Sequence, residues 1–141
     1  MSELGPDAFD FWLGEWDCAF EGGHAVNTIT RVYGGKVIQE NFVVDEPRSW
    51  KGMSVSVHDD AVGWRQTWVD ESGNYWAFVG GMVGDHPSFA TPVPVDSDNV
   101  FKRMVFTDIS PDGFHWRWES SPDGGDGGEW SVNWEIAYTR R

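Results

Sequence analysis

The chain has one cysteine, Cys18, among its 141 residues. One thiol cannot form a disulfide within the chain, and it excludes the CxxC motifs of metal and redox sites. No apolar run approaches the roughly 18 residues of a membrane span. The N-terminus lacks the basic and apolar regions of a secretory signal peptide. We therefore expect a cytoplasmic protein that has no membrane partner.

Basic residues are also scarce, with 10 Lys and Arg against 23 Asp and Glu, for a formal net charge of −13. Nucleic-acid binding depends on a basic face that neutralises phosphates. An anionic membrane likewise attracts basic segments. Neither partner is expected. The four histidines, at positions 24, 58, 86 and 115, have neither HxH nor HExxH spacing. The sequence therefore predicts no metal site and no cofactor.

Helical periodicity is almost absent, and apolar residues instead alternate with polar ones between short turn signals such as "EGGH" and "SPDG". That pattern is typical of an antiparallel sandwich or barrel. Nine or ten strands are enough to close a barrel around one small ligand. Residues 1–141 show no linker or repeat, so one domain is expected. The acidic stretch "SPDGGDGGEW" resembles a structural Asp-box turn.

The N-terminal segment "GPDAFDFWLG" is the exception to the strand pattern. Pro6 and Asp7 suit the first turn of a helix. The motif Gly14-x-Trp16 follows immediately, where the alternating pattern begins. We expect a short helical turn that leads into the first strand.

Three segments in order, "FDFWLGEWD", "GWRQTWVDESGNY" and "WRWESSPDGG...WSVNWEIAYTRR", resemble a group of small bacterial lipocalin-like (calycin-type) proteins, mostly of unknown function. The resemblance implies an all-β fold: a single antiparallel lipocalin-like barrel of about ten strands with a short N-terminal helical plug. It also implies that Trp16 packs across the closed end. Nitrobindin, the haem-binding relative, has a glycine-rich segment after its GxW and a histidine late in its chain. The segment after Gly14-x-Trp16 lacks that glycine pattern and the last predicted strand, "EWSVNWEIAYTRR", has no histidine, so haem is a minor alternative.

The chain has 10 tryptophans, and most share a strand face with other aromatic residues. Such faces pointing inward would line a barrel with flat apolar surface, as in ligand pockets. The alternative is that the rings fill a solid core. One such face is predicted to hold Trp130, Val132 and Trp134 together. The aromatic candidates for ligand binding are Trp16, Trp68, Trp76, Trp116, Trp118 and Trp134.

A few polar residues interrupt these faces. Gln66 lies between two tryptophans, where its amide needs partners, either a ligand or a neighbouring strand. Glu40 alternates with Ile38 and Phe42, so we expect a carboxyl group inside the barrel. Such a carboxyl group would have a raised pKa or would need a cationic partner, for which Arg103 is the candidate. Together, Gln66, Glu40 and Arg103 are expected to orient a ligand.

Two functional hypotheses follow, one for a binding protein and one for an enzyme. In the first, the barrel binds a small, largely apolar molecule that is aromatic or polycyclic. In the second, it is a cofactor-independent isomerase, cyclase or lyase, with Glu40 as the acid or base and His58 at the rim. A structural protein with a solid core is the remaining alternative. Barrels of this kind often dimerise through an outer face, so a homodimer is also considered.

Overall fold

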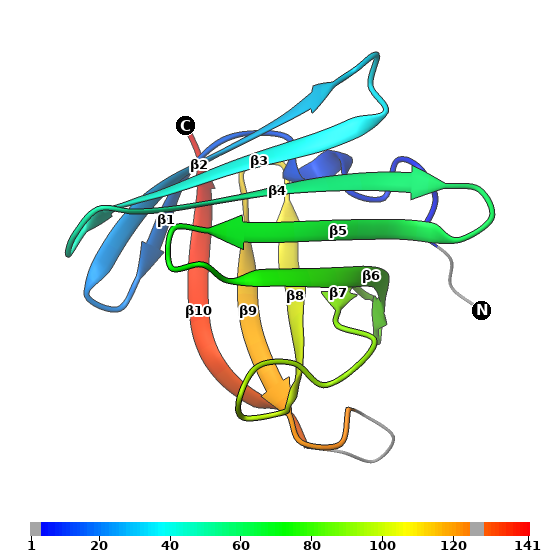
Figure 1. The fold of residues 1–141 in the computed structure, drawn as a ribbon. Coiled ribbons are helices and arrows are strands. Elements are labelled where there is room, and N and C mark those ends of the chain that lie inside the picture. Colours follow the sequence, from blue (N-terminus) through cyan, green and yellow to red (C-terminus); the bar gives the residue numbers. More distant parts are fainter. Residues whose placement is uncertain (1–3, 125–128) are drawn as a thin grey trace.

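The computed structural model describes residues 4–124 and 129–141, which form ten antiparallel strands. Each strand pairs with its neighbours in sequence, and β1 pairs with β10 to close the barrel (Figure 1). The strands are β1 (Gly14–Phe20), β2 (Gly23–Val32), β3 (Val37–Glu46), β4 (Trp50–Asp59), β5 (Gly63–Asp70), β6 (Tyr75–Val83), β7 (His86–Ala90), β8 (Phe101–Ser110), β9 (Gly113–Ser121) and β10 (Ser131–Arg140). The predicted all-β barrel is confirmed, and it is consistent with a lipocalin-like fold. Residues 125–128 of the expected Asp-box turn lie outside the described residues.

The expected helical plug is a single 3-10 turn, η1, over Asp10–Trp12. Phe9, directly before it, is fully buried. Its ring lies 4.6 Å from that of Phe89 and 5.1 Å from that of Trp64, between ring centroids. The Trp64 indole N–H donates to the carbonyl oxygen of Gly5 at 2.8 Å. Aromatic contacts therefore hold the N-terminal segment against one end of the barrel, which we call the closed end.

Trp16 packs at this closed end, as the GxW motif predicts. It is fully buried, and its indole N–H donates to the Trp12 carbonyl at 2.8 Å. The guanidinium carbon of Arg140 lies 4.1 Å from the Trp16 ring centroid, and Arg140 also donates to the Leu13 carbonyl at 2.8 Å. Gly14 has a φ of 129°, and a Cβ there would collide with Arg140. The positive φ therefore favours glycine at Gly14, and any side chain there would also have to displace the Arg140 guanidinium.

Inward and outward residues alternate along most strands, as the sequence predicts. On β5, Trp64 and Gln66 are buried while Arg65 is exposed. The expectation for the start of β10 is wrong, because the register shifts between Val132 and Trp134. A bulge of this kind moves the preceding residues to the opposite face. Val132 is consequently exposed, and the Trp130 ring lies away from the interior.

No helix in residues 4–124 or 129–141 is long and apolar enough to cross a membrane.

Candidate functional site

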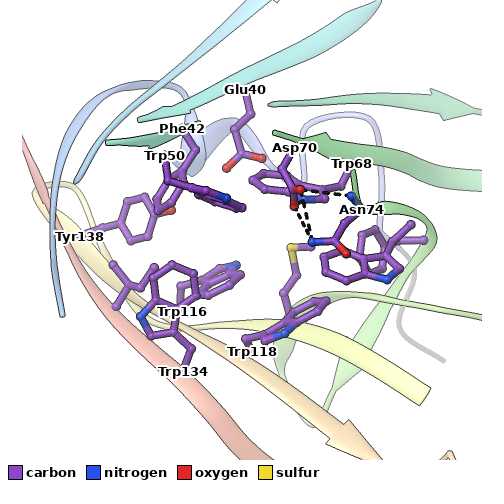
Figure 2. Close-up of a pocket in the computed structure, with 14 residues that line it drawn as sticks. Glu40, Phe42, Trp50, Trp68, Asp70, Asn74, Trp116, Trp118, Trp134 and Tyr138 are labelled. Atoms are coloured by element: carbon purple, nitrogen blue, oxygen red, sulfur yellow. Dashed lines mark hydrogen bonds between the residues drawn. The ribbon is translucent and has the colours of Figure 1, made fainter. Parts of the chain in front are cut away.

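A cavity of about 130 Å³ occupies the barrel interior toward the end opposite η1. We call this end the open end; the turns between β3 and β4 and between β5 and β6 lie there. The interior is therefore not a solid core. Aromatic residues dominate its wall (Figure 2). The lining residues are Glu40, Phe42, Trp50, Trp68, Asp70, Asn74, Trp76, Phe78, Met104, Trp116, Trp118, Trp134, Ile136 and Tyr138.

Tryptophans form two walls that face each other across the cavity (Figure 2). Trp50 and Trp68 make one wall, with ring centroids 6.2 Å apart and planes inclined by 30°. In the other, the Trp116 and Trp118 rings are nearly parallel at 6.1 Å, and Trp134 meets Trp116 edge-on at 5.8 Å. A cavity between two such walls suits a flat apolar group. A tryptophan-rich barrel of this kind is compatible with hydrophobic ligand binding.

The tryptophans near the open end are fixed by hydrogen bonds from their indole N–H groups to neighbouring side chains. Trp50 donates to Ser72 at 2.8 Å, and Trp68 donates to Asp70 at 2.8 Å. Trp76 donates to Asp96 at 3.0 Å. Since these polar edges are satisfied by the protein, the ring orientations are set before a ligand arrives.

Gly52 on β4 makes room for one of these rings. It is buried and faces Trp68 across the β4–β5 hairpin, and a Cβ at Gly52 would collide with the Trp68 indole. The absence of a side chain lets the indole lie against the sheet. Gly52 therefore helps to define the position of the first wall.

Glu40 supplies a carboxyl group at the inner end of the cavity. Its side chain is almost completely buried and points into the cavity (Figure 2). Ser54 donates to its Oε1 at 2.7 Å, and Asn27 donates to its Oε2 at 2.7 Å. Burial raises the pKa of Glu40 above its ordinary value, and the two hydrogen bonds oppose this shift without cancelling it.

Tyr138 completes this polar cluster. The Asn27 amide donates to its hydroxyl oxygen at 2.9 Å. Burial raises the pKa of Tyr138 well above its ordinary value, and burial also raises the pKa of the neighbouring Cys18 thiol. Both groups are therefore neutral hydrogen-bonding groups at physiological pH.

Gln66 faces inward and is buried, but it does not line the cavity. Its amide donates to Ser56 on β4 at 2.9 Å, so the neighbouring-strand alternative is present in the structure. Its Oε1 has no hydrogen-bond partner among the described residues. On the inward face of β5, Gln66 lies between Trp64 and Trp68, and thus between the closed end and the cavity.

The expected pairing of Glu40 with Arg103 is wrong. Arg103 donates to Glu119 at 2.6 Å, and its guanidinium carbon lies 3.9 Å from the centroid of the Trp130 ring. On β8 the cavity-lining residue is the adjacent Met104, so alternation directs Arg103 to the outer face. The alternation of β8 does not reveal which face points inward, because Val105, on the outer face, is also fully buried.

His58 also lies away from Glu40. It faces inward on β4, but at the closed end, with its ring 5.5 Å from that of Trp64. Ser54, the register partner of Glu40, precedes it by four residues, or about 13 Å along a strand. The structure therefore does not bring together the proposed acid and its rim histidine.

The remaining histidines, at positions 24, 86 and 115, are not part of the cavity wall either. An interior haem would consequently have no histidine ligand in the cavity wall. Within the described ranges, no cluster of three or more His, Cys, Asp or Glu side chains is placed to hold a metal ion.

Of the predicted aromatic ligand residues, Trp68, Trp76, Trp116, Trp118 and Trp134 line the cavity, whereas Trp16 belongs to the closed end. Sequence reasoning missed Trp50 and Asn27. Asn27 lies in phase with the buried Ala25 and Ile29, so alternation alone indicates its inward position. Trp50 follows an irregular turn that contains Pro47, where no phase could be extrapolated.

Comparison of the sequence with models of known protein families and with curated protein sequences finds no match. The assignment of function consequently depends on the geometry of the site.

Proposed function

We propose that this protein binds a small, largely apolar molecule with a flat aromatic group between the two tryptophan walls. The observation that carries the proposal is the preformed cavity of about 130 Å³. An apolar cavity of about 150 Å³ accommodates benzene. The enclosed space therefore suits one ring, and a bicyclic or larger ligand would extend toward the open end.

The polar cluster at the inner end would orient the ligand. Glu40 and Tyr138 both line the cavity and carry hydrogen-bonding oxygens. Ligand pockets typically combine an apolar wall with a few such groups, which fix the orientation of the bound molecule. In this proposal, Gln66 does not touch the ligand, because it lies outside the cavity wall and donates to Ser56.

Calorimetric titration with 1-naphthalenemethanol tests the proposal. Trp68→Leu removes part of one wall, so we expect at least a several-fold loss of affinity, since stacking on one aromatic side chain contributes about 1 kcal/mol or more. Trp130→Leu is the matched control, because its ring packs on Arg103 outside the cavity. Equal affinities in the wild type and in both variants would contradict binding between the walls.

An enzyme is the second candidate, and a specific observation favours it. Glu40 is a carboxyl group with a raised pKa that faces a cavity, which is a common arrangement for a general acid or base. Tyr138 is the nearest hydroxyl group in the same cluster. Isomerisation or elimination of a bound molecule would require Glu40 to exchange a proton with it. Conversion of a candidate substrate at an unchanged rate by Glu40→Gln would remove Glu40 from this role.

A further inference from the structure

Glu40 is a carboxyl group without a counter-ion. No lysine, arginine or histidine in the described part of the chain forms an ion pair with it. Its two hydrogen-bond donors, Asn27 and Ser54, are both neutral. A carboxylate buried in this way is costly unless a positive group compensates it. Because Glu40 lines the cavity, a ligand can reach it and supply that charge.

The aromatic walls also suit a cation. The faces of tryptophan rings carry negative electrostatic potential and attract ammonium groups. Two of the cavity-lining rings already bind an ammonium group of the protein. Lys102 Nζ lies 5.9 Å from the Trp76 centroid and 5.8 Å from the Trp118 centroid. Lys102 itself is balanced by Asp96 at 3.6 Å. A second carboxylate, Asp70, lines the cavity near its open end.

From this geometry we infer that the ligand is an organic amine, bound as its ammonium cation with its ammonium group at Glu40 and its aromatic body between the tryptophan walls. The inference rests on the proposed function and adds the chemical class of the ligand. Each Glu40 oxygen accepts one hydrogen bond from the protein and retains capacity for another from an ammonium N–H.

The energetics favour this arrangement. Folding has already removed Glu40 from water, so a ligand does not have to desolvate it again. When the cation enters, the protonated fraction of Glu40 releases its proton to the buffer, and the resulting carboxylate pairs with the ammonium. The formal net charge of −13 also steers cations toward the protein.

Three probes that share one ring system separate the alternatives near neutral pH. They are 1-naphthylmethylamine, which is cationic, 1-naphthalenemethanol, which is neutral, and 1-naphthaleneacetate, the carboxylate anion of 1-naphthaleneacetic acid. Titration calorimetry of the wild-type protein should give the amine the highest affinity, by about 10- to 100-fold over the alcohol, as for a charge-assisted hydrogen bond.

The variants Glu40→Gln and Glu135→Gln complete the test. Each removes one negative charge, but Glu135 is exposed on β10 and lies outside the cavity. Only Glu40→Gln should lose the preference for the amine over the alcohol, whereas Glu135→Gln should keep it. An equal loss in both variants would mean that overall charge, rather than Glu40, selects the amine, and would overturn the inference.

The probes also distinguish the inference from the proposed function. Equal binding of alcohol and amine by the wild type would overturn the amine inference and leave aromatic binding intact. If 1-naphthaleneacetate binds most tightly, the amine inference is overturned in favour of an anionic ligand, with Lys102 as the charged partner. Failure of all three probes to bind would contradict both proposals.

Discussion

Glu40 and Tyr138 share a single hydrogen-bond donor, the side-chain amide of Asn27. Its Nδ2 lies 2.7 Å from Glu40 Oε2 and 2.9 Å from the Tyr138 hydroxyl oxygen. The three residues come from β3, β10 and β2, and Asn27 is fully buried. One neutral side chain therefore connects strands on different parts of the barrel wall and sets the polar inner end of the cavity.

The first prediction concerns this donor. Asn27→Leu keeps a similar volume but leaves two buried acceptors without their donor, so we expect the free energy of unfolding to fall by about 1–3 kcal/mol. Urea denaturation monitored by circular dichroism measures the change. The neighbouring, outward-facing Thr28→Ala is the control and should change stability by much less. A loss no larger than that of the control would show that the shared hydrogen bonds contribute little.

This cluster shows which features of the site the sequence predicts and which it does not. Strict alternation on β3 correctly predicts that Glu40 faces inward between Ile38 and Phe42. It does not reveal the partners, because Asn27 and Ser54 are set by the registers of β2 and β4 against β3. Register depends on turns and on packing over the whole barrel, which a local pattern does not encode.

The errors elsewhere have the same origin. Arg103 alternates with Val105, a typical core residue, which favours an inward position, yet the outer face of β8 is also covered. A two-residue period continued through the irregularity in β10 wrongly predicts that Trp130 faces inward. A bulge adds one residue to one strand only and leaves no clear signal in alternating sequence.

The second prediction follows from the raised pKa of Glu40. Folding favours its protonated form, so the native state binds more protons than the unfolded state between the ordinary value of 4.5 and the raised pKa. Wild-type stability should therefore fall relative to Glu40→Gln as the pH rises from about 4.5 through the raised pKa, by at most about 1.4 kcal/mol per pH unit.

Urea unfolding of the wild type and of Glu40→Gln across this pH range measures the difference in their free energies of unfolding. Titrating groups that the two proteins share contribute equally to both values and cancel in this difference. The other ionisable groups of the cluster, Cys18 from β1 and Tyr138 from β10, have raised pKa values and stay neutral in this range. Asn27 and Ser54 face Glu40 from β2 and β4 and do not titrate. Parallel stability curves for the two proteins would contradict a raised pKa in the folded state.

The third prediction concerns Gly52. In Gly52→Ala, the new methyl group and the Trp68 indole cannot occupy their present positions together, so the ring should shift into the cavity. We expect weaker binding of 1-naphthalenemethanol and a changed near-ultraviolet circular dichroism spectrum. Gly81→Ala is a matched control, because a Cβ there makes only an ordinary contact with Ser88. Unchanged affinity in Gly52→Ala would show that the first wall tolerates displacement.

The fourth prediction separates the closed end from the cavity. Arg140→Met removes the cation over Trp16 and the hydrogen bonds to the Leu13 and Pro111 carbonyls. We expect a loss of about 1–3 kcal/mol in the free energy of unfolding, with naphthalenemethanol affinity unchanged in the folded protein. Arg141→Met, which removes only a longer ion pair with Asp17, should change stability less. A variant that stays fully stable but loses affinity would contradict this separation.

The most direct test of the account is where a bound aromatic ring lies. Intermolecular nuclear Overhauser effects between 1-naphthalenemethanol and the labelled protein measure this position. The account predicts contacts to indole protons of both walls, from Trp68 on one side and from Trp116 and Trp134 on the other. Contacts confined to the exposed valines 55 and 79, on the outer face of β4 and β6, would place the ligand outside the barrel and contradict the account.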